Sequence, residues 1–333
     1  MPQFRQNFIT KEWVIVAPER GKRPDQFAKE KNHDHSALPI HDPSCPFCPG
    51  NESLTPPPSL VLGGPGGWKL RVVPNKFAAV EPSLVPERRN DGLFLSAAGF
   101  GMAEVIIEHP AHNTTLALMN DEEVIGVVTA YKTRYAALAS NPDIDLVTIF
   151  RNHGRAAGTS LIHPHSQVIA TPIVPPHVRH LMQQAIIYHD TRGTCPYCDM
   201  MKEELSNGIR VVEETPHHVA WCPWASRVPF ETRIMPRRHY SRFDSMTDEE
   251  SADLARLLRR TLLRLHAGLG DPDHNIVIST SPTSDGEVHY DHWRLTITPR
   301  MTTAAGFEMG SGIFINTTPP EDAAAFLRGV EVI

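Results

Sequence analysis

The chain of 333 residues has little that would make it a membrane, secreted or nucleic-acid-binding protein. No run approaches the 18 or so apolar residues that a membrane-spanning helix needs. The N-terminus, MPQFRQNFITKEWVIV, has no basic segment followed by an apolar one, so we expect no secretory signal and a cytoplasmic location. The 32 basic residues are outnumbered by 38 acidic ones, and this net charge of −6 argues against a dedicated nucleic-acid binder.

Cysteine is scarce, yet four of the 5 cysteines form two Cys-x-x-Cys pairs, Cys45 with Cys48 and Cys195 with Cys198. A reducing cytoplasm disfavours disulfides, and neither pair is expected at the start of a helix, where a redox pair would lie. Because the chain also has 18 histidines, the pairs predict zinc held by thiolates and imidazoles. One site with four thiolates is an alternative, but each pair has its own downstream histidines, which favours two zinc ions per chain.

Similar stretches follow the two pairs and indicate an internal repeat. Each contains a strand-like segment, a histidine, a capped amphipathic helix and further strands, the last of which carries histidines and ends in Thr-Pro. The expected helices begin at Asn120 or Asp121 and at Thr247 or Asp248. We therefore predict an α+β fold made of a duplicated unit, in which a helix packs on antiparallel strands. Two unrelated domains with similar turns are the alternative.

If the two units are equivalent, each metal site draws its ligands from the same places. The first would consist of Cys45, Cys48, His112 and one of His163 and His165, and the second of Cys195, Cys198, His239 and one of His289 and His292. Alignment of the units on Thr-Pro pairs His165 with His292 and leaves Tyr290 opposite His163. The sequence leaves the fourth ligand of each site open.

The segment from Asn152 to Gln167 is the richest in chemistry. In His163-Pro164-His165, strand alternation sends both imidazoles to one face, so one can bind a metal while the other faces a substrate. An unprotonated imidazole is a nucleophile, and the Gly158-Thr159 backbone, Ser160 and Gln167 could donate to phosphoryl oxygens. The alternative is a structural strand with two zinc ligands or core histidines.

This segment resembles the active-site strand of the galactose-1-phosphate uridylyltransferases, which belong to the histidine-triad superfamily. Their His-Pro-His-x-Gln motif is preceded by Asn, Gly and Ser at the spacings of Asn152, Gly158 and Ser160. The resemblance extends over nearly the whole chain. It includes an Arg-x-x-Arg-Pro phosphate clamp at Arg20 and Arg23, the first cysteine pair, a nucleoside-contacting turn at Asn75, and a sugar-contacting segment at Phe307 and Glu308.

The resemblance implies two tandem histidine-triad-like units, residues 1–178 with the catalytic strand and residues 179–333 with the second zinc site. It also implies a ping-pong mechanism in which His165 attacks the α-phosphorus of a nucleoside diphosphate sugar, hexose 1-phosphate leaves, and an acceptor takes the nucleotide. His163 then becomes a zinc ligand, Gln167 and Ser160 hold phosphoryl oxygens, and Arg20 and Arg23 neutralise the diphosphate. A homodimer is expected from the same resemblance.

The chain departs from the better-known bacterial transferases of this family in one respect. Their second metal site uses a C-terminal His-x-His, and the matching stretch here reads Thr296-Ile297-Thr298. The second Cys-x-x-Cys instead resembles a plant-type branch with ADP-glucose phosphorylase activity, which favours His292 as a zinc ligand over His289. The first-choice function is UDP-glucose–hexose-1-phosphate uridylyl transfer, and the second is adenylyl transfer from ADP-glucose to phosphate. A nucleotide-releasing hydrolase and a non-catalytic nucleotide-sugar-binding protein are the remaining hypotheses.

Overall fold

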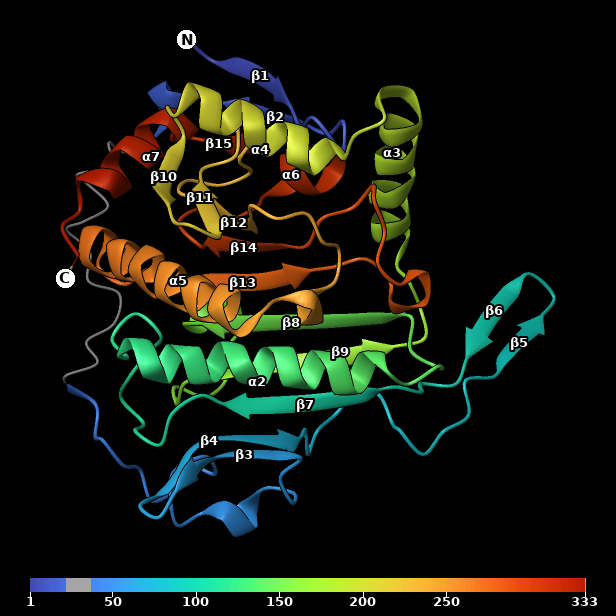
Figure 1. Ribbon diagram of the computed structural model, residues 1–333, viewed down its shortest axis with the longest axis vertical. Helices are drawn as coiled ribbons and strands as arrows, with labels where there is room; N and C mark the ends of the chain where they lie inside the picture. Colours follow the sequence, from blue (N-terminus) through green and yellow to red (C-terminus); the bar gives the residue numbers. More distant parts are fainter. Residues whose placement is uncertain (22–36, 333) are drawn as a thin grey trace.

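The computed structural model describes residues 1–21 and 37–332 (Figure 1). Two long helices, α2 and α5, lie side by side on one face of a large sheet. The α-helices are α2 (Asp121–Ala139), α3 (Pro176–Arg192), α4 (Pro196–Asn207), α5 (Asp248–Leu269), α6 (Gly306–Ser311) and α7 (Pro320–Gly329). Among the described residues, no helix combines the length and the apolar character needed to cross a membrane.

The large sheet has ten strands, all paired antiparallel, in the order β10-β11-β12-β14-β13-β8-β9-β7-β4-β3. The strands from the first part of the chain are β3 (Leu60–Gly64), β4 (Gly67–Pro74), β7 (Met102–Ile107), β8 (Leu146–His153) and β9 (His165–Thr171). Those from the second part are β10 (Val211–Glu214), β11 (His218–Trp221), β12 (Thr232–Pro236), β13 (His274–Ser279) and β14 (Arg294–Pro299). The predicted α+β class with antiparallel sheets and packed helices is confirmed.

The strand order supports the predicted duplication. Counted from the centre outward, β8, β9, β7, β4 and β3 on one side correspond to β13, β14, β12, β11 and β10 on the other. The two sets of five strands join where β8 pairs with β13, so that His153 lies opposite His274. Helix α3 spans the expected boundary near residue 178, and the division into residues 1–178 and 179–333 stays a prediction.

Both long helices begin at the predicted places because each has a capping box. The side chain of Asn120 accepts a hydrogen bond from the Glu123 amide, and the Glu123 carboxylate accepts one from the Asn120 amide. Thr247 and Glu250 do the same for α5. Each box satisfies two amides that the first turn leaves without an intrahelical partner.

The core lies between these two helices and the sheet. The predicted apolar stripes are buried: Val124, Val127, Val128, Tyr131 and Tyr135 on α2, and Leu254, Leu257, Leu258, Leu262 and Leu265 on α5. Each buried leucine contributes about 1.5–3 kcal/mol relative to an exposed one. The opposite face of the sheet carries side chains that are less buried, and a cavity lies where the central strands β8 and β9 meet their connecting segment.

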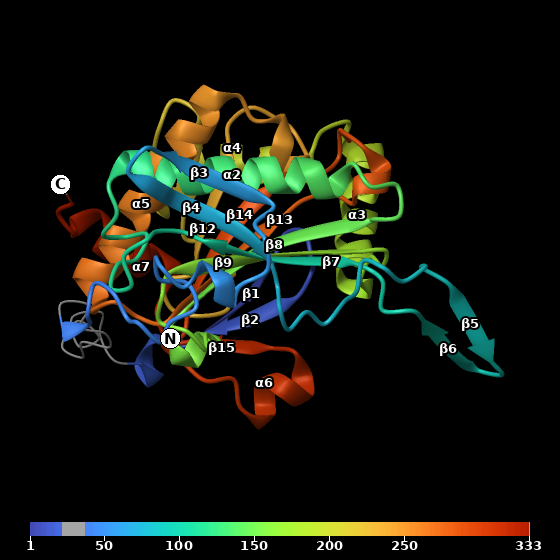
Figure 2. The same ribbon diagram turned by 90° about the horizontal axis from the view of Figure 1, so that it is seen from below.

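Two smaller sheets complete the described structure. Strands β1 (Gln3–Gln6) and β2 (Trp13–Val16) form a hairpin, and β15 (Phe314–Asn316) adds in parallel to β2, so the first and last parts of the chain pack together. Strands β5 (Arg88–Asp91) and β6 (Phe94–Ala97) form a second hairpin that projects away from the rest of the molecule (Figure 2).

Candidate active site and metal centres

The first cysteine pair meets two histidines from distant parts of the chain. Ligand atoms of Cys45, Cys48, His112 and His163 all lie within 4.8 Å of one another, and all four residues are buried. The Cys48 Sγ atom is 3.6 Å from the Nδ1 atoms of both His112 and His163. This is a tetrahedral donor set of the kind that holds a structural metal ion with bonds of about 2.0–2.3 Å.

The second nitrogen of His163 supports that reading. Its Nε2 atom lies 2.8 Å from the carbonyl oxygen of His109, which can only accept, so Nε2 carries the proton and Nδ1 is free to bind a metal. Burial lowers the pKa of His163 to about 4, which keeps the ring neutral. Burial raises the pKa of the Cys45 thiol to about 11, so binding of a cation would release protons as thiolates form.

The second pair forms an equivalent group. Ligand atoms of Cys195, Cys198, His239 and His292 lie within 4.8 Å of one another, and Cys198 Sγ is 3.3 Å and 3.4 Å from Nδ1 of His239 and His292. The Nε2 atom of His239 donates to the Val288 carbonyl oxygen at 3.1 Å. His289 is exposed and lies outside the group, as the preference for His292 predicted.

Two expectations about this half were wrong. Cys195 is the N-cap of α4, so the second pair does lie at the start of a helix. Its neighbours are nevertheless two histidines that could bind a metal ion with it. The Thr-Pro alignment was also wrong, because His163 and His292 are the equivalent ligands and each comes two residues before a strand. The stretch from the ligand to Thr-Pro is shorter in the second half, which shifted the alignment by two residues.

His165 is the first residue of β9 and lines a cavity of about 600 Å³. Its Nδ1 atom donates to the carbonyl oxygen of His163 at 2.8 Å, which leaves the lone pair on Nε2. Burial lowers the pKa of His165, so the unprotonated form is favoured. The Phe47 ring, between the first two cysteines, packs against the imidazole with ring centres 5.5 Å apart. The ring is thus oriented from two sides.

A buried polar network lies on the other face of β9, behind His165. The Ser166 hydroxyl contacts Tyr131 of α2 and donates to Glu108, and Glu108 forms an ion pair with Arg151 at 3.1 Å. The Glu108 side chain is 0% exposed and that of Arg151 3%. Sequence reasoning did not find this network, although a glutamate closing an apolar strand and a serine inside the His-Pro-His motif were signals for it.

Three further predicted residues line the same cavity, namely Asn152, Thr159 and Ser160. Gly158 adopts a φ of +93°, a left-handed conformation that favours glycine, at the end of the turn that leads into this segment. Asn275 of β13 donates to the Asn152 side chain at 2.8 Å and so fixes it from the second half of the sheet. Alternation along β9 places Gln167 on the same face as His165.

The remaining predicted residues lie apart from this cavity. Asn75 accepts a hydrogen bond from the Phe77 amide, and Phe307 is half exposed on α6. Glu308 caps α6, and the charge of Arg20 helps to lower the pKa of Glu308, after the backbone hydrogen bonds that are the main cause. Arg23 lies outside the described residues. The described chain therefore brings Arg20 toward Glu308 but brings neither of them, nor Asn75 or Phe307, to the cavity wall.

Comparison with known families shows the family to which the chain belongs. A model described as the N-terminal domain of galactose-1-phosphate uridyl transferase matches residues 1–175, and that range includes His165 and the first metal group. The chain belongs to the galactose-1-phosphate uridylyltransferase family. A second model, of a domain of unknown function, DUF4921, matches residues 110–327. The chain is a nucleotidyltransferase of this family, and the relatives below carry names of the same kind.

Two relatives illustrate the breadth of the match. The chain is 34% identical to the ADP-glucose phosphorylase of Arabidopsis thaliana over 99% of its own length and 93% of the relative. It is also 34% identical to the galactose-1-phosphate uridylyltransferase of Haemophilus influenzae, over 78% of its length and 72% of the relative. Both activities are therefore represented among its relatives.

Solved structures of this family share the fold. An Arabidopsis thaliana ADP-glucose phosphorylase with bound ADP-glucose superposes with a TM-score of 0.83 at 32% identity and covers 100% of both chains. A uridylyltransferase structure superposes with a TM-score of 0.76 at 27% identity and covers 98% of this chain and 97% of the other.

Proposed function

We propose that the protein transfers a nucleoside monophosphate through a covalent nucleotidyl-His165 intermediate. The observation that carries the proposal is the orientation of His165, whose Nδ1–H is tied to the His163 carbonyl while Nε2 remains unprotonated beside a cavity of about 600 Å³. A nucleophile must be held in position and must not be protonated, and this geometry supports both requirements.

The proposed reaction has two balanced steps. In the first, Nε2 attacks the α-phosphorus of a nucleoside diphosphate sugar, a P–N bond forms, and the P–O bond to hexose 1-phosphate breaks. In the second, a phosphate oxygen of the acceptor attacks the same phosphorus, and the P–N bond breaks. Imidazole suits this exchange because it is both a good nucleophile and a good leaving group.

The neighbouring residues have supporting roles in the proposal. Ser160, Thr159 and the backbone at Gly158 donate to phosphoryl oxygens, Asn152 positions the substrate, and Gln167 acts from the His165 face of β9. The proposed roles of Arg20, Arg23, Asn75, Phe307 and Glu308 in binding the diphosphate, nucleoside and sugar rest on the family resemblance.

Two substrate pairs are candidates. Adenylyl transfer from ADP-glucose to phosphate is supported by a relative that matches 99% of the chain and by the fold of a structure that holds ADP-glucose. Uridylyl transfer between UDP-glucose and hexose 1-phosphate, the first choice from sequence, is supported by the family model and the Haemophilus influenzae relative. We place the adenylyl reaction first, because the relative with that activity is 34% identical over 99% of the chain, whereas the uridylyltransferase structure that covers 98% of the chain is 27% identical.

We further propose that both Cys₂His₂ groups hold zinc, since two thiolates and two imidazoles suit Zn²⁺ best. The first ion would be bound by Cys45, Cys48, His112 and His163. Its bond to His163 would hold the backbone segment that leads into His165. Elemental analysis tests this directly: two zinc ions per chain are expected, and any other metal or a single equivalent contradicts it. Assembly as a homodimer remains a proposal from the family, and sedimentation analysis tests it.

Mass spectrometry of the intact protein tests the reaction. The protein is incubated with ADP-glucose or with UDP-glucose, without an acceptor, and the adduct mass identifies the nucleotide. Addition of inorganic phosphate or of galactose 1-phosphate then shows which acceptor removes it. The His165→Ala variant should carry no adduct, whereas His289→Ala, which removes an exposed histidine, should react like the natural protein. An adduct on His165→Ala would disprove the assignment of the nucleophile.

A further inference from the structure

Arg294 occupies, in the second half, the position that His165 has in the first. His163 and His292 are the equivalent metal-type ligands, and the residues two positions later, His165 and Arg294, begin the equivalent strands β9 and β14. The side chain at this position points to the same face of its strand in both halves. The second half therefore presents a guanidinium where the first half presents a nucleophile.

A second cavity, of about 370 Å³, lies beside Arg294. The sheet register places its polar wall on one face: Arg233 of β12 pairs with Thr296 of β14, and Ser279 of β13 pairs with Arg294. The volume lies within the range of about 300–1,000 Å³ that is usual for small-molecule sites. Hydroxyl groups and guanidinium groups thus converge on a space large enough for a small ligand.

Arg233 has no carboxylate within ion-pair distance among the described residues, and the charge of Glu231, which lines the same cavity, acts on it from further away. It forms no ion pair with any residue that the structure describes, and its buried Nε atom has no hydrogen-bond partner there. Its Nη1 atom makes a weak contact of 3.9 Å with the Met200 sulfur. Burial lowers the pKa of Arg233, and the charge of Arg294 acts in the same direction. A bound anion would relieve both effects.

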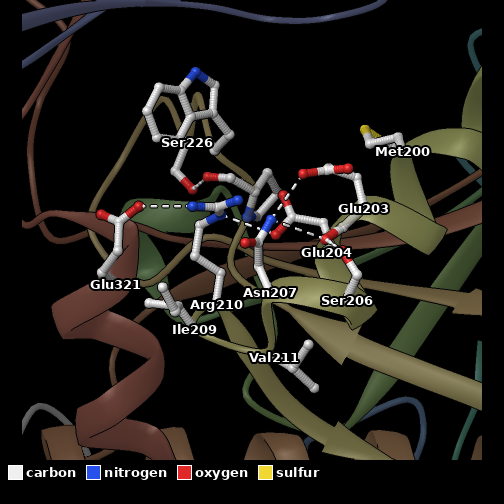
Figure 3. A network of polar contacts seen from close by, with 12 residues as sticks. Met200, Glu203, Glu204, Ser206, Asn207, Ile209, Arg210, Val211, Ser226 and Glu321 are labelled. Atoms are coloured by element: carbon white, nitrogen blue, oxygen red, sulfur yellow. Dashed lines mark hydrogen bonds and ion pairs between the residues drawn. The ribbon is translucent and has the colours of Figure 1, made fainter.

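A neighbouring arginine shows how the same half of the protein satisfies a buried guanidinium when its role is structural. Arg210 lies 2.9 Å from Glu204 and 2.9 Å from Glu321, and the two carboxylates hold it from opposite sides (Figure 3). The side chain of Arg210 is 11% exposed. Arg233 is not held by a pair of carboxylates in this way. Its side chain lines a cavity, which is the arrangement expected of a ligand-binding arginine.

The other charges around the cavity leave a positive surplus. Arg227 pairs with Glu12 at 2.9 Å, and Arg294 pairs with Asp291 at 3.4 Å. Glu231 also lines the cavity and accepts a hydrogen bond from the Arg227 amide. Arg300 is exposed at the rim, where it donates to Asn275. The described lining therefore has four arginines and one carboxylate, and two of the arginines pair with carboxylates outside the lining.

We propose that the cavity between Arg233 and Arg294 is a second anion-binding site, which takes the phosphate group of a small phosphorylated molecule or inorganic phosphate. The planar forks of two arginines match phosphate oxygens, and the hydroxyls of Thr296 and Ser279 supply further donors. The site has no imidazole at the reacting position, so it binds without forming a covalent adduct.

Equilibrium dialysis with labelled inorganic phosphate tests the proposal on the full chain. The natural protein should bind one equivalent more than Arg233→Met, whose second-site affinity should fall at least about tenfold, since a charge-assisted hydrogen bond contributes about 1.5–3 kcal/mol. Arg71→Met is the matched control, because Arg71 is also buried without an ion pair to a described residue but lies in the first half. Arg71→Met should bind the same number of phosphate equivalents as the natural protein.

Glucose 1-phosphate added as a competitor distinguishes the two sources of the anion. Stronger displacement than unlabelled phosphate would identify a phosphomonoester site, and equal or weaker displacement would identify a phosphate site. Formation of the nucleotidyl adduct should be unchanged in Arg233→Met, which separates this proposal from the reaction at His165.

If Arg233→Met does not fold, crystals of the natural protein soaked in tungstate give the same answer. An anomalous peak between Arg233 and Arg294 supports the site. Binding of the same number of phosphates by the natural protein and Arg233→Met, or a tungstate map without that peak, overturns it.

Discussion

Strands β9 and β14 occupy matching places in the sheet, and each begins two residues after a metal-type histidine, yet they carry different chemistry. Strand β9 begins with His165, next to a glycine-containing turn and a cavity of about 600 Å³, whereas β14 begins with Arg294, next to a cavity of about 370 Å³. The comparison shows that the duplicated framework alone does not provide a nucleophile. In the proposed mechanism, the residue at one position and the turn before it decide which half can react.

The helix-facing sides of the two strands differ as well. Behind His165, Ser166 joins Glu108, Arg151 and Tyr131 in a buried polar network. Behind Arg294, the equivalent position is Leu295, which is 1% exposed and belongs to the apolar core. Most polar atoms this deep are hydrogen-bonded, and this polar network is present behind His165 but not behind Arg294.

Removal of the imidazole at the start of β9 should have the largest effect on activity. His165→Ala should lower turnover by on the order of 10³-fold or more, because it removes the nucleophile and not a binding contact. Initial rates with each nucleotide sugar measure the loss.

The reciprocal variant, Arg294→His combined with His165→Ala, should form no adduct, because Glu287, Val288 and His289 stand where the first half has its Gly158-Thr159-Ser160 turn. An adduct on residue 294 would show that the framework by itself suffices and would break the comparison.

Loss of a cysteine from either pair should lower metal content and stability, but only loss from the first pair should also lower activity strongly. Cys48→Ser and Cys198→Ser should each lose about one metal equivalent and lower the melting temperature by about 5 °C or more, since metal binding is coupled to folding. Only Cys48→Ser should also reduce turnover strongly, because His163 of that group contributes the carbonyl that orients His165. Equal loss of activity in both variants would contradict this separation.

Loss of the buried ion pair behind β9 should destabilise the protein strongly. Glu108→Ala leaves the Arg151 guanidinium buried without its carboxylate, which should cost about 3–5 kcal/mol. Glu249→Ala, which removes a carboxylate whose side chain is 81% exposed, should cost less than about 1 kcal/mol. Denaturant unfolding measures both, and similar values for the two variants would mean that the network does not support the reactive half.

The smallest expected effect concerns the capping boxes of α2 and α5, and it is a change of folding stability with pH. The hydrogen bond from Arg238 lowers the pKa of Glu250 from 4.5 to about 2. A lowered folded-state pKa stabilises the protein above pH 4.5, and this contribution is lost as the pH falls toward 2. Because the Arg238 side chain is 51% exposed, we expect only about 1–2 kcal/mol after screening by solvent.

Thermal unfolding of Glu250→Gln and of the matched variant Glu123→Gln tests this effect between pH 7 and pH 3. The stability difference between Glu250→Gln and the natural protein should shrink as the pH falls. A difference that does not change with pH would assign the effect to the cap alone.

Local patterns predicted much of this molecule. The starts of α2 and α5 follow from Asn120 with Glu123 and from Thr247 with Glu250, since a capping box needs only four consecutive residues. The His-Pro-His motif predicted two imidazoles in different surroundings, and the structure places His163 beside the first cysteine pair and His165 at the cavity. The predicted reason was wrong, because His163 precedes β9 and strand alternation does not apply to it. The alignment of the halves failed because it used the strand ends at Thr-Pro, whereas the equivalence is fixed at the strand starts by the metal-type histidines.

The sequence by itself determined the elements, the caps, the cysteine pairs and the candidate nucleophile, because each of these depends on residues that are neighbours in the chain. Only the tertiary structure decided that Arg151 pairs with Glu108 and that Arg233 lines a cavity without an ion pair to a described residue. These contacts join residues far apart, as Cys48 and His163 are at a separation of 115 residues. Their pairing is set by strand register and packing over the whole sheet, which no local pattern records.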